Sequence, residues 1–105
     1  MDTGDTAPPF DLPTDTGANV SLAGLAGKKV VLYFYPRDDT PGCTTEAIAF
    51  TAAKADFAAA DTIVIGVSKD SVAAHAKFRK KHDLDVELGA DPDGSVIEAY
   101  GAWVE

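Results

Sequence analysis

The chain has 105 residues, of which 46% are hydrophobic and 25% charged, which suits one globular domain over residues 1–105. Its 17 acidic and 9 basic residues give a net charge of -8, which argues against nucleic acid and anionic membranes as partners. The acidic start lacks a signal-peptide pattern, no apolar run approaches membrane-spanning length, and one cysteine cannot form an internal disulfide, so a cytoplasmic location is expected.

The first segment predicts a small antiparallel hairpin. Short alternating apolar patterns at 10–12 and 19–22 flank a turn at 15–17. Ser21 can then cap one short helical turn, which Gly27 ends.

The pattern changes sharply at the only cysteine. Residues 30–35 form a continuous apolar and aromatic run, which is typical of a buried strand. Residues 44–59 are rich in alanine and predict a helix. The helical spacing predicts a buried stripe made of Ala49, Phe50, Ala53 and Phe57.

The second half repeats the order of strand and helix. Residues 63–67 predict a second buried strand, and residues 72–82 predict a helix with a basic end. A short strand at 86–88, a turn at 91–94 and a short helix capped by Ser95 follow. This alternation predicts an α/β fold with a central parallel sheet flanked by helices.

Two strong strands would make a very small sheet with open backbone edges. The sequence also ends on Trp103 and Val104 without a polar tail. We therefore expect a domain that is incomplete at its C-terminus, with strands missing, or a sheet edge that a partner covers.

The surroundings of Cys43 favour a reactive thiol. It is expected at the C-terminal end of a strand, where open α/β sheets usually carry their chemistry. Thr40 can act as the N-cap and Pro41 suits the first helical position, so Cys43 falls in the first turn. The helix dipole and the free N–H groups there favour the reactive thiolate. The alternative is a buried structural cysteine, because free cysteine is among the most buried residue types.

Other polar clusters predict no site, and no cofactor is expected. His75 and His82 lie seven residues apart without a further ligand at suitable spacing, so we expect surface histidines and no metal. The adjacent Asp38 and Asp39 are expected to be solvated. Residues 91–94 lack the first and last ligands of a calcium loop.

Residues 36–43 have the spacing P-x-x-x-T-x-x-C, and over 33–47 the chain resembles the peroxiredoxins, specifically the bacterioferritin-comigratory-protein subfamily. Stretches at 7–12, 66–78 and 91–103 agree, so the resemblance covers essentially the whole chain. It implies a thioredoxin-like fold. It also implies an antioxidant, thiol-dependent peroxidase that reduces hydrogen peroxide or organic hydroperoxides.

The resemblance also implies roles for individual residues. Cys43 would be the peroxidatic cysteine, whose thiolate attacks the O–O bond and becomes a sulfenic acid. Thr40 would hydrogen-bond the thiolate and the peroxide, and Pro36 would shield the sulfur from water. The N–H groups of Gly42 and Cys43 would stabilise developing charge, and Glu46 would help to hold an arginine.

The chain departs from the family at two points. Many subfamily members carry a resolving cysteine five residues after the peroxidatic one, where this chain has Ile48. A 1-Cys enzyme is therefore expected, reduced by an external thiol such as thioredoxin, glutaredoxin or glutathione. The family's active-site arginine follows the Tyr-Gly-x-Trp region, where the sequence ends, and neither Arg37 nor Arg79 matches its position.

Three hypotheses follow for function. The first is a thiol peroxidase with Cys43 as nucleophile, monomeric as many relatives are. The second is a truncated peroxiredoxin-like domain with little turnover, acting as a redox-sensing or binding module. The third is a structural domain with an inert, buried cysteine.

Overall fold

The computed structural model of the chain describes residues 7–25 and 27–101. The polar lead-in before residue 7, and Trp103 and Val104 near the end, lie outside the described residues. The elements, in chain order, are β1 (Asp11–Pro13), β2 (Asn19–Ser21), the 3-10 turn η1 (Ala23–Leu25), β3 (Lys29–Phe34), α1 (Pro41–Ala52), α2 (Lys54–Ala59), β4 (Thr62–Ser68), α3 (Val72–His82), β5 (Glu87–Ala90) and α4 (Ser95–Ala99).

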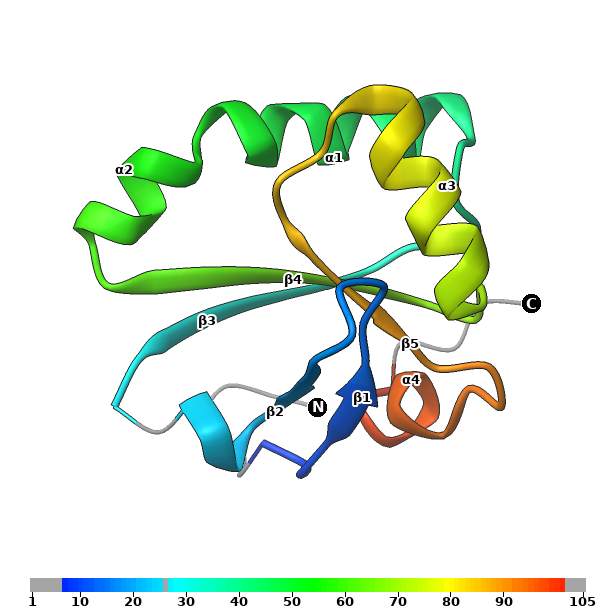
Figure 1. Cartoon of the computed structure of the whole chain (residues 1–105). Coiled ribbons are helices and arrows are strands. Elements are labelled where there is room, and N and C mark those ends of the chain that lie inside the picture. Colours follow the sequence, from blue (N-terminus) through cyan, green and yellow to red (C-terminus); the bar gives the residue numbers. More distant parts are fainter. Residues whose placement is uncertain (1–6, 26, 102–105) are drawn as a thin grey trace.

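The central sheet has three parallel strands in the order β3-β4-β5, which confirms the predicted α/β fold. Strand β4 is the central strand, and its last five residues, 64–68, are all buried, as expected for a strand covered on both faces. The short strand predicted at 86–88 extends to Ala90 and pairs with β4, so the sheet is larger than the two strong strands alone. All three strands run in one direction and so end at one edge of the sheet (Figure 1).

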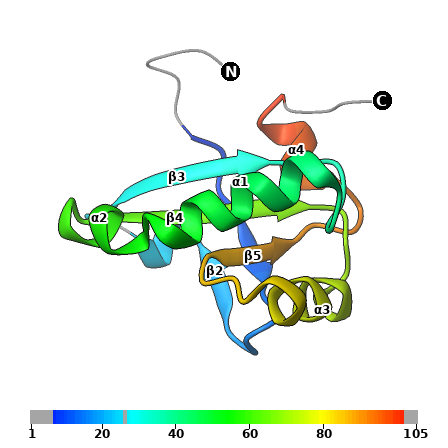
Figure 2. The ribbon, with the colours of Figure 1, turned by 90° about the horizontal axis from the view of Figure 1, so that it is seen from above.

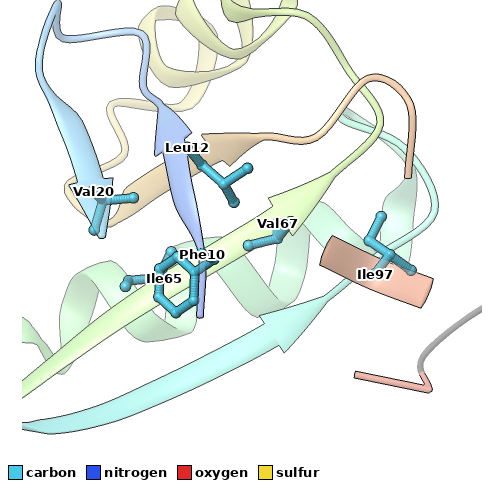
Figure 3. Packing of buried hydrophobic residues seen from close by; sticks show 6 residues of the cluster. All are labelled: Phe10, Leu12, Val20, Ile65, Val67 and Ile97. Atoms are coloured by element: carbon cyan, nitrogen blue, oxygen red, sulfur yellow. The ribbon is translucent and has the colours of Figure 1, made fainter. Parts of the chain in front are cut away.

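The N-terminal hairpin and α4 cover one face of this sheet (Figure 1). The predicted hairpin is confirmed, with β1 and β2 antiparallel and Leu12 opposite Val20. Gly17 supplies the positive φ of 88° in the turn. The cluster on this face includes Phe10, Leu12, Val20, Ile65, Val67 and Ile97 (Figure 3). Burial of these apolar side chains fastens the hairpin to the sheet.

Helices α1, α2 and α3 cover the opposite face. Viewed from above, α1 runs across β4 while α3 lies beside β5 (Figure 2). The apolar cluster of this face consists of Ala47, Phe78, Leu84, Val86 and Leu88, with Phe50 packed against it. The result is three layers, with the sheet between two sets of covering elements.

The long helix predicted at 44–59 is two helices. Helix α1 begins at Pro41, and the chain breaks at Ala53, whose φ and ψ are -92° and 4°, before α2. The predicted stripe is also partly wrong, because Ala49 is exposed while Ala47 is buried. The break turns α2 so that the ring of Phe57 packs on that of Phe50, 5.9 Å away.

Helix α3 has the predicted bounds. Ser71 caps it by accepting a hydrogen bond from the N–H of Ala74, and Asp83 ends it in the left-handed conformation. The short helix α4 differs from prediction, because Ser95 is its first residue and not its cap. The Asp91 carboxylate accepts from the N–H of Ile97 at 2.9 Å instead. No helix in the described part of the chain is long and apolar enough to cross a membrane.

Candidate active site

Cys43 lies at the junction of β3 and α1, as the sequence predicts. Strand β3 ends at Phe34, opposite Val67 of β4, and the loop 35–40 leads from this edge of the sheet into α1. Cys43 is the third residue of α1, and its free thiol is half-buried. A half-buried thiol in the first helical turn can meet a small molecule from solvent, which argues against an inert core cysteine.

The start of α1 has its amide donors available. Thr40 occupies the N-cap position, but its side chain makes no capping bond, contrary to prediction. Its hydroxyl donates instead to the carbonyl of Arg37, at 3.1 Å. The first N–H groups of a helix have no partner within the helix, so those of Gly42 and Cys43 remain for an anion. The helix dipole adds to this preference for negative charge at the sulfur.

The remaining predicted residues surround Cys43 in different ways. Pro36, Gly42 and Glu46 are exposed, whereas Thr40 is half-buried. Gly42 shares the first turn of α1 with Cys43, Thr40 is the N-cap residue of that helix, and Pro36 is the second residue of the loop 35–40 that precedes it. Glu46 lies one turn further along α1, on the same side of the helix as Cys43. Five of the expected groups therefore occupy one short loop and one helix end.

Tyr33 is a neighbour of the site that the sequence does not single out. Burial, followed by the charges of Glu46 and Cys43, raises the pKa of its hydroxyl far above the ordinary value. Its ring stacks between those of Tyr35 and Phe50, at 5.7 and 4.8 Å. Among the described residues, its buried hydroxyl has no hydrogen-bond partner.

Two residues that the family comparison raised lie elsewhere. Arg79 binds the carboxylate of Asp15 at 2.6 and 3.1 Å and donates to the carbonyls of Leu84 and Val86. Its side chain is thus bonded to the hairpin turn and to the segment that precedes β5. Ile48, at the position of the resolving cysteine in many relatives, has 46% of its surface exposed on α1.

The expectation that Asp38 is solvated and His75 lies on the surface is wrong. The side chain of His75 is 0% exposed and that of Asp38 6%, and they form an ion pair with Nδ1 and Oδ2 2.6 Å apart. The Tyr35 hydroxyl also donates to Asp38, at 2.6 Å. Burial lowers the pKa of His75, but the hydrogen bond and charge of Asp38 and the carbonyl of Gly89 outweigh it, so that the pKa is raised. One signal was available in the sequence, since His75 and Phe78 have the spacing of one buried helix face.

Asp39 is exposed, as expected, but it is not free. Its left-handed backbone, with φ of 61°, directs it to the end of α3. There it binds Lys81 at 2.6 Å and His82 at 2.7 Å. These hydrogen bonds lower the pKa of the Asp39 carboxyl. The loop before Cys43 is therefore tied to α3 at two points.

The described residues form no metal centre at this loop. Within 7–25 and 27–101, no three His, Cys, Asp or Glu side chains are grouped so that they could hold a metal ion. A hollow of about 260 Å³ lies at the other end of the sheet, where its lining includes Lys28, Phe50, Phe57 and Thr62. That hollow lies where the strands begin, and Cys43 is not part of it.

Comparison with known proteins agrees with this arrangement. Residues 3–105 match the model of the AhpC/TSA family. The putative peroxiredoxin bcp of Coxiella burnetii is 50% identical over 105 residues, which are all of this chain and 70% of that protein. The crystal structure of peroxidoxin BcpB from Mycobacterium tuberculosis superposes with a TM-score of 0.89 at 40% identity, over 96% of this chain and 66% of that one. A structure of the Xanthomonas campestris bacterioferritin comigratory protein, described for its alkyl peroxide reduction activity, has a TM-score of 0.84 at 37% identity, over 88% and 59%.

A parallel sheet between helices, with a cysteine in the first helical turn after β3, defines a protein of the thioredoxin-like fold. More narrowly, the chain belongs to the AhpC/TSA family, as a peroxiredoxin of the bacterioferritin-comigratory-protein group, whose enzymes are thiol-dependent peroxidases. The chain spans about two thirds of the length of the curated relatives that it matches.

Proposed function

We propose that this chain reduces hydrogen peroxide and organic hydroperoxides with Cys43 as the nucleophile. The observation that carries the proposal is the half-buried thiol in the first turn of α1, at the carboxyl end of β3. The family membership supports the same chemistry. The alkyl peroxide reduction activity described for the Xanthomonas campestris relative supports organic hydroperoxides as substrates.

The proposed reaction begins with the Cys43 thiolate. Its sulfur attacks one peroxide oxygen, so that an S–O bond forms, the O–O bond breaks, and the other oxygen leaves as hydroxide or alkoxide. Protonation of that oxygen gives water or an alcohol, while the cysteine is left as a sulfenic acid. The N–H groups of Gly42 and Cys43 stabilise the negative charge that develops on the oxygens.

Other residues of the loop are proposed to shape this step. Thr40 is proposed to hydrogen-bond the thiolate and the peroxide with its hydroxyl, which does not cap α1 and which donates to the carbonyl of Arg37 when no peroxide is bound. Pro36 limits the access of water to the sulfur. Glu46 is proposed to orient an arginine that contacts the thiolate.

We further propose that the sulfenic acid is reduced from outside the chain. Because the sequence has only one cysteine, a first external thiol forms a mixed disulfide and releases water, and a second thiol releases Cys43. Thioredoxin, glutaredoxin and glutathione are the reductants proposed. The protein is further proposed to be monomeric and cytoplasmic.

The deciding experiment measures how fast stoichiometric hydrogen peroxide oxidises Cys43, followed by intact mass spectrometry. We expect oxidation at least about a hundredfold faster than that of free cysteine, because the helix end stabilises the thiolate and the developing charge. Cys43→Ser should gain no oxygen atom under the same conditions. A wild-type rate no faster than free cysteine would support the redox-sensing or binding module instead.

A further inference from the structure

A buried network ties the loop before Cys43 to α3 and to β5. Asp38 lies five residues before Cys43, and its carboxylate pairs with Nδ1 of His75. The other imidazole nitrogen, Nε2, lies 3.1 Å from the carbonyl oxygen of Gly89 in β5. The backbone N–H of Asp38 donates to the carboxylate of Asp70 at 2.7 Å. Side chain and main chain of one loop residue are thus both held.

This geometry defines the protonation of His75. A carbonyl oxygen can only accept, so Nε2 carries a proton toward Gly89. The Asp38 carboxylate accepts from Tyr35 through one oxygen and faces Nδ1 through the other. This arrangement suits an imidazole with protons on both nitrogens, which is a buried cation.

The groups around the imidazole favour that cation. Asp38 faces it from the loop, Asp70 from the end of β4, and the Gly89 carbonyl from β5. The Tyr35 ring lies 6.4 Å from it, and its hydroxyl is bonded to Asp38. On α3 itself His82 lies two turns away, against the ring of Phe78.

We propose that Asp38 and His75 form a positioning pair, which holds the loop 36–40 in the geometry that lets Cys43 react with peroxide. The inference rests on the proposed function and adds residues to its site. The pair acts as a positioning element, through the loop that carries Thr40 into α1 and not by contact with the peroxide. Misplacement of a reacting group by about 1 Å can cost about a hundredfold in rate.

The ion pairs that Asp39 of the same loop forms with the end of α3 provide a matched control. Asp39 binds Lys81 and His82 on the same helix, but its side chain is 41% exposed. Exposed ion pairs contribute little because water and salt screen them. His82→Gln and His75→Gln are therefore the same substitution on one helix, each facing one of two neighbouring loop acids. The side chain of His82 is 21% exposed and that of His75 is 0% exposed.

The first experiment compares the two variants with the wild-type chain in two reactions of Cys43. His75→Gln should slow oxidation by stoichiometric hydrogen peroxide by about tenfold or more. Its alkylation by iodoacetamide, which needs the thiolate but not peroxide positioning, should change less than about threefold. His82→Gln should change either rate by less than about twofold.

The second experiment tests the ion pair with two measurements that do not depend on peroxidase activity. Nitrogen-15 spectra of the wild-type side chains should show His75 with both ring nitrogens protonated at pH 7. The pKa of His75 is raised on folding, so the stability that it contributes is fully present below its unfolded pKa of about 6.5 and is lost as pH rises through the folded pKa. The excess stability of wild type over His75→Gln, from urea unfolding, should therefore shrink between pH 6 and pH 9.

The outcomes separate this inference from the proposed function. A folded His75→Gln variant with an unchanged peroxide rate, or a neutral His75 at pH 7, would overturn the positioning pair. If His75→Gln does not fold, Asp38→Asn takes its place, because it removes the charge and keeps the size of the side chain. A wild-type protein no faster than free cysteine would overturn the peroxidase, while the spectra and the unfolding curves would still decide the ion pair.

Discussion

Tyr33 combines a well-packed ring with an unpaired hydroxyl. The ring stacks on Phe50, and a methyl group at Gly66 would come within 2.6 Å of it, so β4 needs glycine beneath the tyrosine. The hydroxyl is buried and has no partner in the described part of the chain. An unsatisfied buried hydroxyl costs about 1 to 3 kcal/mol, so this residue stabilises less than its packing would allow.

We predict that Tyr33→Phe raises the free energy of unfolding by about 1 kcal/mol, because the ring stays and the desolvated hydroxyl goes. Urea unfolding followed by circular dichroism measures the change. Tyr100→Phe is the matched control, since the Tyr100 hydroxyl donates to the carbonyl of Pro8 at 2.6 Å. That variant should lose about 1 kcal/mol. A loss of stability in Tyr33→Phe would contradict the prediction.

Among single residues, those of the site that are close together in the sequence can be predicted from it, whereas contacts between residues far apart in the sequence cannot. The spacing of Pro36, Thr40 and Cys43 predicts where the thiol lies, because one loop and one helix end contain all three. The partnership of Asp38 with His75 joins residues 37 positions apart, and no local pattern encodes it. Asp38 turns inward while Asp39, in its left-handed conformation, turns outward, so neighbouring acids have opposite surroundings.

Helices α3 and α1 begin in different ways. Ser71 caps α3 through a hydrogen bond from the N–H of Ala74, at 3.1 Å. Thr40 stands at the same position of α1, yet its hydroxyl points back to the carbonyl of Arg37. Ser71 therefore stabilises the start of α3, whereas Thr40 leaves the first N–H groups of α1 without a side-chain partner.

These caps predict opposite outcomes for the same kind of substitution. Ser71→Ala should lower the free energy of unfolding by about 1 kcal/mol and leave the peroxide rate of Cys43 unchanged. Thr40→Ala should cost less than about 0.5 kcal/mol, yet slow the oxidation of Cys43 by about tenfold or more. Thermal unfolding and mass spectrometry on both variants provide the comparison. Equal losses of stability would show that Thr40 is an ordinary cap.

The bounds of a helix could be predicted where the local sequence contains capping residues at both of its ends. Helix α3 has a capping serine, a basic last turn and a left-handed Asp83, and its predicted bounds are correct. The break at Ala53 has no such signal, because alanine favours helix on either side of it. The ring of Phe57 packs against that of Phe50 across the break, and no capping residue in the local sequence indicates this arrangement.

Arg79 connects parts of the molecule that are remote in sequence. Its guanidinium binds Asp15 in the hairpin turn, and the side chain of Asp15 is only 2% exposed. It also donates to the carbonyls of Leu84 and Val86, which precede β5. The hairpin, α3 and β5 thus share one planar, multiply bonded cation.

We predict that Arg79→Ala lowers the free energy of unfolding by about 3 kcal/mol, because it leaves a buried carboxylate and two carbonyls without their donor. Denaturant unfolding measures the loss. Lys80→Ala, at the exposed neighbouring position, should stay within about 0.5 kcal/mol of wild type. If the two variants lose equally little, the cation does not hold the hairpin to the sheet.

The parallel sheet also determines when the site is completed during synthesis. Each strand pairs with the next only after an intervening helix has been made, and Thr14 meets Gly89 across most of the chain. Cys43 is therefore translated before Asp70, His75 and Gly89, whose contacts hold the loop that precedes it. On the proposed function, the nascent chain carries an ordinary cysteine, and its reactivity with peroxide arises only when β5 docks.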